Sequence, residues 1–568
     1  MSSEDPAENA VSSDDFPLTI DFGLDKSPAI SGEIDLPAYD VRARQDLSSK
    51  DISSVKRCLQ MDFRELVTSP SSATYATHRI HKHPAVFIPQ IPRHIIETYS
   101  TKNDEDGDRP LIFDPFSGSG TAGLEAKLLG RDYLGVEINP LSKLVSEVKV
   151  QPIPPSLANQ AKQDLIQILK NTENGYHANY DPEFLDTTNK ELWFEPKAIN
   201  GLTRIRKALD DFDIYAYDIL SNCGEFETKI IQSENIDRQE VQSRLYRWFV
   251  LMIANTVYEV SNADPGISKA YRSPKMKDLI NEGKHPPDPI QVFTSELNTS
   301  FEMLEELWHS IYESTEQAAA HQDNSLDNAL DENPAHKAVV DIRSGDAREF
   351  SDPDYQDSVD LAITSPPYIN AINYYRGTKL RLFWIHDLME EIIDSTDLRQ
   401  SFVGTNSVSI RNKENLPKTT LGQWNGTTEE FQSTSLSELD QTILDIHSGE
   451  LSEAKRRAYT TWKFFNVDMV RSLTRTYELL KPGAHFFLVI GENTIGGHQI
   501  QSHKYLADIA QNLGKFNRHG GNLSKVDGYH FIGYAWDEIS NRALFQDRNH
   551  SNGVIEGEWV VILQKPRP

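Results

Sequence analysis

Cysteine and long apolar runs are scarce in this sequence. The chain of 568 residues has two cysteines, Cys58 and Cys223, which are too few for a disulfide framework or a multi-cysteine zinc site, although one bridge remains open. No uninterrupted apolar run approaches the ~20 residues that a membrane-spanning helix needs. The opening MSSEDPAENAVSSDDF also lacks the basic start and the apolar segment of a secretory signal. We therefore expect a cytoplasmic protein with no membrane partner.

Positive charge is also in deficit. The 57 Lys and Arg residues against 85 Asp and Glu residues give a formal net charge of −28. This balance argues against a protein that coats nucleic acid by bulk charge, because such binding depends on many contacts between basic side chains and phosphates. A local basic groove is still compatible with the total, since net charge reports on solubility and not on one surface. The length allows roughly two to four domains.

The composition changes along the chain and predicts alternating segments. Residues 1–55 are rich in Asp, Ser and Pro and are expected to form an acidic, disordered arm. The rest is expected to be one α/β domain interrupted by a helical insertion with its linker and by a later polar insertion. The domain is assigned to residues 75–150, 336–394 and 461–568, and the two insertions to residues 155–335 and 395–460.

The stretch LIFDPFSGSGTAGLEAKLLGRDYLGVEINP predicts a β-loop-α-β unit. Residues 111–113 read as a strand, residues 123–129 as a helix ended by Gly130, and residues 133–138 as a second strand. Upstream of this unit, Pro92 is predicted to open another helix.

Further elements follow the same logic. Apolar residues from Leu245 to Val260 recur at steps of three and four, which predicts a long helix with one buried face. The polar stretch 314–337 reads as a linker. Together these elements predict a doubly wound α/β sheet. Its later strands are expected at residues 339–342, 359–363, 486–490 and in the closing GEWVVILQKP.

The turn after the first strand carries Gly118, Gly120 and Gly123 in the spacing GxGxxG, and Glu137 follows Asp114 by 137 − 114 = 23 positions. Glycines let the backbone approach a ligand closely, and a carboxylate ending the second strand can accept hydrogen bonds from ribose hydroxyls. This pattern fits either NAD or S-adenosylmethionine. Asp114 favours the positively charged S-adenosylmethionine, because a carboxylate at the strand tip would repel a pyrophosphate.

A second informative loop, Ile-Thr-Ser-Pro-Pro-Tyr at residues 363–368, directly follows a predicted strand. Two prolines stiffen the loop and remove two N–H donors, so that the Pro366 carbonyl is free to accept a hydrogen bond. Ser365 is a second acceptor and Tyr368 offers a flat face. The loop can therefore hold an exocyclic amine while the ring stacks, as a nucleobase turned out of its helix requires. The plain alternative is a proline-rich turn with a packed tyrosine.

DPFSGSGT together with TSPPY resembles the S-adenosylmethionine-dependent DNA amino-methyltransferases. The resemblance is to the cytosine-N4 type in particular, in which Ser replaces the acidic first loop residue common in the adenine-N6 type. It extends to residues 81–90, which resemble the family's cofactor-covering segment, and to residues 344–347 and 479–492. Val86 departs from the family, which often has Lys there. The matching pieces span about residues 75–565.

The resemblance implies a Rossmann-like methyltransferase sheet and assigns the site residues. Glu137 would bind the ribose of the cofactor, and Asp346 would lie near its adenine amine. The complete cofactor set would be Asp114, Pro115, Phe116, Ser117, Gly118, Gly120, Thr121, Glu137 and Asp346. The catalytic residues that hold the target base would be Ser365, Pro366, Pro367 and Tyr368.

The function implied is a sequence-specific methyltransferase that modifies the exocyclic N4 amine of cytosine in double-stranded DNA, with the target base flipped out. A cognate restriction endonuclease is an expected partner, no metal is required, and the later insertion, 395–460, is favoured for target recognition. Adenine-N6 methylation and RNA methylation remain alternatives. Two alternatives from other functional classes also remain. The chain could be a NAD-dependent oxidoreductase or a catalytically silent DNA-binding relative.

The cysteines argue against methylation at carbon 5 of cytosine, and the histidines argue against a metal site. No cysteine follows a proline at a strand end, which argues against methylation at carbon 5 of cytosine, since that reaction needs a thiolate. His78, His81 and His83 are spaced like metal ligands, but their neighbours indicate an ordinary loop beside the cofactor.

Basic residues after TSPPY are the best candidates for contacts to DNA phosphates. Arg376, Lys379 and Arg381 follow the predicted base-binding loop closely and are expected to reach the backbone. Tyr374 and Tyr375 are expected to pack beside the displaced base.

Overall fold

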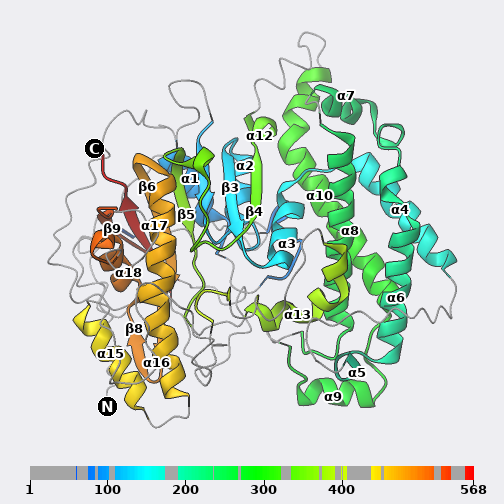
Figure 1. Ribbon diagram of the computed structural model, residues 1–568. Coiled ribbons are helices and arrows are strands. Elements are labelled where there is room, and N and C mark those ends of the chain that lie inside the picture. Colours follow the sequence, from blue (N-terminus) through cyan, green and yellow to red (C-terminus); the bar gives the residue numbers. More distant parts are fainter. Residues whose placement is uncertain are drawn as a thin grey trace, which may run out of the picture.

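A sheet of eight strands forms the centre of the fold in the computed structural model (Figure 1). The residues described are 59–60, 74–83, 87–100, 109–172, 190–233, 236–265, 270–320, 334–369, 374–389, 398, 401–405, 436–449, 453–516, 526–538 and 557–567. The expected arm, Cys58 and Val86 lie outside these residues, as does much of the expected polar insertion, including all of 406–435.

The sheet is mostly parallel. Its strand order is β1-β9-β10-β6-β5-β2-β3-β4, and only β10 runs antiparallel to its neighbours. This topology confirms the doubly wound α/β class. The strands are β1 (Leu59–Gln60), β2 (Leu111–Asp114), β3 (Asp132–Glu137), β4 (Val340–Ser344), β5 (Val359–Thr364), β6 (Leu480–Gly491), β9 (His530–Glu538) and β10 (Gly557–Gln564), with a separate hairpin of β7 (Asn493–Ile495) and β8 (His498–Ile500).

The direction of winding reverses between β2 and β5. After β2 the chain adds β3 and β4 on one side, and it then returns to add β5 and β6 on the other. Ile112 pairs with Leu361 and Phe113 with Ala362, so the carboxyl ends of the two strands lie next to each other. Because the loops after them diverge, such a switch point opens a crevice where ligands bind in α/β sheets.

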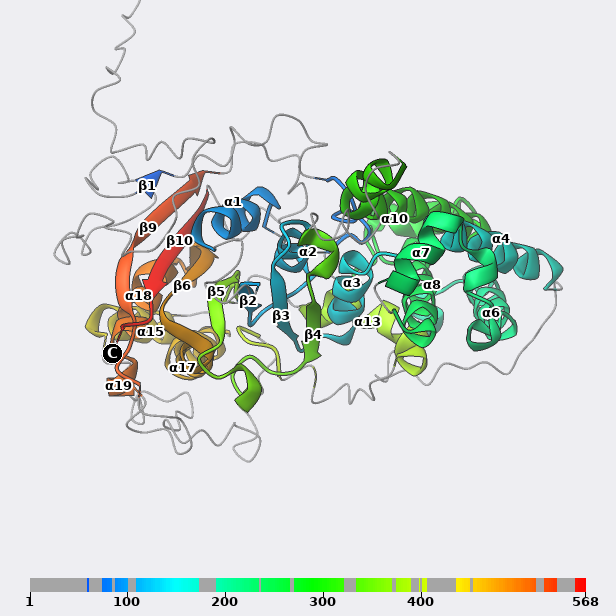
Figure 2. The ribbon, with the colours of Figure 1, turned by 90° about the horizontal axis from the view of Figure 1, so that it is seen from above.

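Both faces of the sheet are buried, which explains the nearly continuous apolar runs of its central strands. Ile112 packs in the cluster that includes α1 (Gln90–Tyr99), whereas its neighbour Phe113 packs in the cluster on the opposite face. Figure 2 shows α1 and α2 on one side of the sheet and α17 on the other. The helices associated with the sheet are α2 (Thr121–Leu128), α3 (Pro140–Val150), α12 (Pro334–Lys337), α15 (Ser437–Ser448), α16 (Ala454–Lys463), α17 (Met469–Leu479), α18 (Ser502–Gln511) and α19 (Leu513–Phe516).

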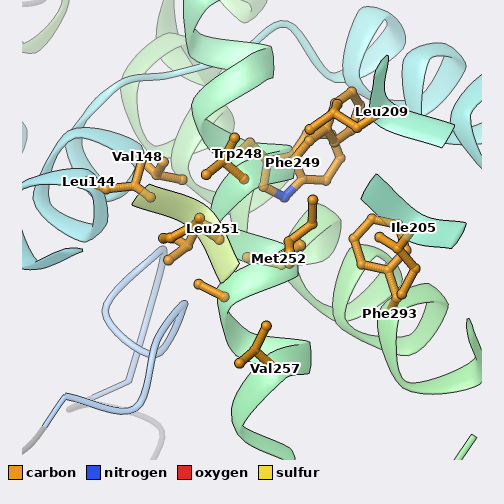
Figure 3. Close-up of a cluster of buried hydrophobic side chains, with 14 of the residues drawn as sticks. Leu144, Val148, Ile205, Leu209, Trp248, Phe249, Leu251, Met252, Val257 and Phe293 are labelled. Atoms are coloured by element: carbon orange, nitrogen blue, oxygen red, sulfur yellow. The ribbon is translucent and has the colours of Figure 1, made fainter. Parts of the chain in front are cut away.

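A helical lobe stands beside β4 and α3 and has a core of its own. Trp248 and Phe249 of α8 are fully buried there, together with Phe293 of α10 (Figure 3). The apolar stripe predicted from Leu245 to Val260 lies on α8. Among the described residues, no helix has the length and apolar character to cross a membrane. The helices of the lobe are α4 (Pro155–Asn171), α5 (Lys190–Trp193), α6 (Pro196–Asp211), α7 (Glu225–Ser233), α8 (Arg238–Val260), α9 (Pro274–Asn281), α10 (Pro289–Ala320) and α13 (Tyr374–Ile385).

Several predicted boundaries differ from the observed ones, and two of the differences have a clear physical reason. Helix α1 begins at Gln90 and not at Pro92, because a proline in the first turn gives up only an N–H that has no partner inside the helix. Helix α10 continues to Ala320, so the predicted linker 314–337 starts as helix. Its Glu, Gln and Ala residues are strong helix formers, and this preference outweighs the polar composition.

Candidate active site

A cavity opens at the carboxyl ends of the central strands, where the two motif loops meet. Its empty volume, counting the open mouth, is about 770 Å³. It is lined by His83, Phe87, Pro115, Phe116, Ser117, Gly118, Ser119, Thr121, Val136, Glu137, Ile138, Asn139, Ser142, Gly345, Asp346, Ala347, Ser365, Pro367, Ser401, Phe402 and Val403.

A hydrogen bond between Thr364 and Asp114 joins the two strand ends. The Thr364 hydroxyl donates to Oδ1 of Asp114 over 2.5 Å, and the Phe116 amide donates to the same oxygen over 2.9 Å. Both side chains are buried, at 1% exposure for Asp114 and 0% for Thr364. Burial raises the pKa of Asp114 to about 7, although the bond from Thr364 acts in the opposite direction.

The Gly-rich turn depends on glycine for its shape. Gly118 and Gly120 have φ angles of 55° and 74°, in the left-handed region that other residues enter only with strain. A Cβ on Gly120 would lie 3.0 Å from Cα of Ser146 in α3, so the turn also packs too closely for a side chain. Helix α2 starts immediately afterwards at Thr121, which places the turn at the helix N-terminus.

Glu137 ends β3 on the wall of the cavity. Its two carboxylate oxygens accept hydrogen bonds of 2.7 Å from the Gly118 and Asn139 amides. Burial raises the pKa of Glu137 to about 7 despite these bonds. Two carboxyl groups with raised pKa values, Asp114 and Glu137, therefore flank one turn, and a cationic ligand would favour their charged forms.

The loop after β5 supplies a second wall. Ser365 and Pro367 line the cavity, whereas Tyr368 is only 5% exposed and does not. The Tyr368 hydroxyl donates a 2.5 Å hydrogen bond to Glu558 of β10, and the Asn493 side chain donates to the Ile369 carbonyl over 3.2 Å. These two hydrogen bonds connect the loop to β10 and to the start of β7.

The two predicted loops therefore share one cavity, as the sequence analysis requires. Nine of the predicted residues line it, namely Pro115, Phe116, Ser117, Gly118, Thr121, Glu137, Asp346, Ser365 and Pro367. Asp114, Gly120, Pro366 and Tyr368 are buried around it without lining it. The individual roles of all these residues remain predictions.

Several lining residues were not singled out from the sequence. His83 and Phe87 belong to the stretch 81–90 that resembles a cofactor-covering segment, so a local signal for them existed. Ser401, Phe402 and Val403 come from the start of the expected polar insertion. Their only sequence signal is an apolar pair in polar surroundings, which is too common to identify a site.

Arg381 was expected to contact DNA phosphates, and this expectation is wrong. Its guanidinium is buried, at 8% exposure, and lies 4.0 Å from the ring centroid of Tyr258. The Lys379 ammonium lies 5.6 Å from the ring of Trp193 inside the helical lobe. Both residues belong to α13, whose apolar face packs against α8, and Tyr375 is buried as well.

Burial and hydrogen bonds define the surroundings of Cys223, His78 and His83. Burial raises the pKa of the Cys223 thiol to about 12, which disfavours the nucleophilic thiolate. His83 shares a 3.0 Å hydrogen bond with the Ser142 hydroxyl, and His78 one of 2.6 Å with Glu125. Within the described ranges, no group of three or more His, Cys, Asp or Glu side chains could hold a metal ion.

Comparisons with known proteins agree with this geometry. A family model described as a DNA methylase (N6_N4_Mtase) matches residues 44–145, which include the Gly-rich turn and β3. The Type II methyltransferase M.MvaI of Kocuria varians is 24% identical over 454 residues, covering 78% of this chain and 82% of that protein. The Type II methyltransferase M.BsoBI of Geobacillus stearothermophilus is 23% identical over 359 residues, covering 62% of this chain and 60% of that protein.

A third relative matches a shorter stretch of the chain with higher sequence identity. The Type II methyltransferase M2.MboI of Moraxella bovis is 41% identical over 66 residues, covering 12% of this chain and 22% of that protein. No solved structure matches the chain. The sheet topology, the cavity at its switch point and these relatives support one assignment, to the N6/N4 family of DNA methyltransferases, whose members use S-adenosylmethionine as the methyl donor.

Proposed function

We propose that this protein methylates the exocyclic N4 amine of cytosine at a specific sequence in double-stranded DNA. One observation carries the proposal: Phe116 of the Gly-rich turn and Ser365 of the TSPPY loop line the same cavity, beside the bond that joins Asp114 to Thr364. The donor and acceptor loops therefore lie within reach of one bound substrate pair. Sequence specificity is proposed by analogy with the Type II relatives.

The residues around the turn fit S-adenosylmethionine. Gly118 lines the cavity and leaves room for a ligand to approach the backbone, and the cavity-lining carboxylate of Glu137 supports hydrogen bonding to ribose hydroxyls. Phe116 and Val136 supply apolar surface for the rest of the molecule. When bound, S-adenosylmethionine supplies a methyl group on a positively charged sulfur, a charge that the carboxylate of Asp114 favours.

The TSPPY loop has the acceptors that an exocyclic amine needs. An amine conjugated with a ring is a poor nucleophile, because its lone pair is delocalised. The hydroxyl of Ser365 and the carbonyl of Pro366 accept hydrogen bonds from the two amine hydrogens and orient the lone pair toward the donor. One amine proton then leaves to water. Positioning and electrostatics carry the reaction, without a nucleophilic side chain.

The partly buried position of Ser365 supports the proposal that the target base leaves its helix. Ser365 is half-buried and lies at a strand end, so a base stacked in a duplex would not reach it. Ser365 also favours cytosine over adenine, since the adenine-N6 enzymes of this family commonly have an acidic residue at that place. Adenine-N6 methylation uses the same loop chemistry and is the nearest alternative.

Nucleoside analysis of modified DNA tests the proposal. The full chain would be expressed in a bacterial host free of DNA methylation, and the genome hydrolysed and analysed by mass spectrometry, with sequencing to locate the marks. We expect N4-methylcytosine at one short recurring sequence, and none with Asp114→Ala as the control. N6-methyladenine would replace the cytosine assignment, whereas methylated RNA alone or no methylation would refute the proposal.

A further inference from the structure

The short segment Ser401–Thr405 touches both halves of the site. On one side Ser401, Phe402 and Val403 line the cavity that the Gly-rich turn also lines. This segment lies near the start of the predicted insertion 395–460, which is favoured for target recognition, yet it forms part of the cavity wall. Phe402 and Val403 are buried, at 6% exposure each, so this part of the wall is well packed.

The other side of the segment lies against the TSPPY loop. Gly404 has a φ of 69°. A Cβ placed on it would lie 3.4 Å from the Tyr368 carbonyl oxygen and 3.6 Å from both the Pro367 carbonyl oxygen and Cα of Ile369. Its neighbours are therefore backbone atoms, which cannot rotate away as a side chain would. These are ordinary van der Waals distances, so the segment packs directly against the backbone of the loop that would hold the base.

Arg348 binds the backbone of this segment. Its Nη2 donates to the Ser401 carbonyl over 2.7 Å, and its Nη1 donates to Oδ1 of Asp468 over 2.8 Å. The same guanidinium grips Asp346, with Nε 2.8 Å from Oδ1 and Nη2 2.5 Å from Oδ2. Arg348 thus fixes a cavity-lining carboxylate and a cavity-lining backbone segment with one rigid group. Lysine lacks this planar fork of donors.

The support for Arg348 is itself buried and charged. Asp468 is 1% exposed and also accepts bonds of 2.7 and 2.8 Å from the Lys463 ammonium. It is the last residue of η10 (Phe464–Asp468), a π-helical turn inside the long helix formed by α16 and α17 (Figure 1). Burial disfavours charge on Arg348, but Asp468 and Asp346 outweigh it and hold its pKa above the usual value. The cation therefore remains charged throughout the working pH range.

We propose that Ser401–Thr405 couples the two subsites, with Arg348 as the positioning residue on the cofactor side and Gly404 on the base side. This inference rests on the proposed function, because it assumes that the TSPPY loop holds the acceptor base. The physical reason is packing: a segment wedged between the cavity and the loop cannot move at one end without displacing the other. Neither residue contacts the reacting atoms; each acts through the segment.

The cofactor side is tested with Arg348→Met and Arg348→Lys. We expect calorimetric affinity for S-adenosylmethionine to fall on the order of tenfold in Arg348→Met, because the bonds to Asp346 and Ser401 are lost. Arg348→Lys should recover part of the loss, since it keeps the charge near Asp468. The matched control is Arg206→Met, which removes a buried arginine that binds Asp387 and the Trp384 carbonyl in the helical lobe. This control should lower the melting temperature but not the affinity.

The base side is tested with Gly404→Leu, because a Cβ alone would lie in ordinary van der Waals contact with the loop and the larger side chain extends beyond it. Its control is Gly283→Leu, which has the same φ of 69° but nothing within 4 Å of the added Cβ, so that backbone strain is matched and the contact is not. We expect Gly404→Leu to reduce kcat on DNA on the order of a hundredfold while affinity for S-adenosylmethionine changes little, because the loop is displaced and the pocket is not. Gly283→Leu should keep both values.

The outcomes separate this inference from the proposed function. If the wild-type chain yields no methylated base, the proposed function fails first. If it methylates DNA but Arg348→Met binds S-adenosylmethionine as tightly as Arg206→Met does, the cofactor side of the coupling is refuted. Equal kcat values in Gly404→Leu and Gly283→Leu would refute the base side.

Discussion

The hydroxyl of Thr364 and the carboxylate of Asp114 are hydrogen-bonded over 2.5 Å although 250 positions separate them in the chain. Each residue ends a central strand, and the loops that follow carry the two motifs of the site. The bond therefore adds to the pairing of β2 with β5 and joins the residue before the Gly-rich turn to the residue before the TSPPY loop. It also explains why a threonine stands before Ser365, since its hydroxyl points inward to Asp114 and not into the cavity.

Replacement of Thr364 tests this bond directly. Thr364→Val keeps the shape of the side chain but removes the donor from the buried Asp114, so we expect a loss of about 1–3 kcal/mol in the free energy of unfolding. The methylation rate should fall as the two loops lose their register. Thr364→Ser keeps the hydroxyl and should retain most of the activity. Denaturant unfolding and initial methylation rates measure the two effects, and a Val variant as stable and active as the Ser variant would contradict the role of the bond.

The raised pKa values of Asp114 and Glu137 predict two opposite responses to pH. Burial lifts them from 3.8 and 4.5 to about 7, so between those values the folded chain binds more protons than the unfolded one. The contribution of these groups to stability is therefore full below the unfolded pKa values and is lost as the pH rises toward about 7.

Ligand binding should follow the reverse trend. Ionised carboxylates favour a cationic ligand, so we expect affinity for S-adenosylmethionine to rise from about pH 5.5 to about pH 7.5. Titration calorimetry across that range measures it. Glu137→Gln should bind more weakly and show a flatter profile, and an affinity independent of pH in the wild type would contradict the assignment.

The buried position of Tyr368 predicts different results for two substitutions. Tyr368→Phe removes only the hydrogen bond to Glu558, and we expect a loss of about 1–3 kcal/mol in stability with activity reduced but measurable. Tyr368→Ala also removes the ring beneath the loop and should abolish methyl transfer while the chain stays folded. Circular dichroism and a methylation assay distinguish the cases. Normal methylation by the Ala variant would show that the ring is not needed.

Gly120 is the residue of the turn that tolerates change least. Gly120→Ala places a Cβ in a left-handed conformation and against α3, so we expect about 1–2 kcal/mol of strain and a loss of S-adenosylmethionine binding. Gly118→Ala has its nearest outside atom at 3.7 Å, and its effect should be smaller. Thermal melts with and without ligand compare the two. A Gly120→Ala chain that still gains stability from the ligand would overturn this view of the turn.

The amino-acid sequence by itself determined the local features of the site. The left-handed glycines, the apolar strands β2, β3 and β5, and the rigid TSPPY loop arise from interactions between residues that are close in the chain, and they are readable for that reason. The sequence also located most of the cavity wall, since Phe116, Glu137 and Ser365 follow directly from strand ends.

Only the tertiary structure decided which distant groups complete the site. The burial of Arg381 in the helical lobe, the support of Tyr368 by Glu558 and the grip of Arg348 on Ser401 all join segments far apart in the chain. Such contacts depend on how elements pack, and the composition of a segment does not encode its neighbours. The sequence around a basic residue is the same whether its side chain binds a DNA phosphate or a carboxylate inside the protein. The partner is determined by how distant segments pack.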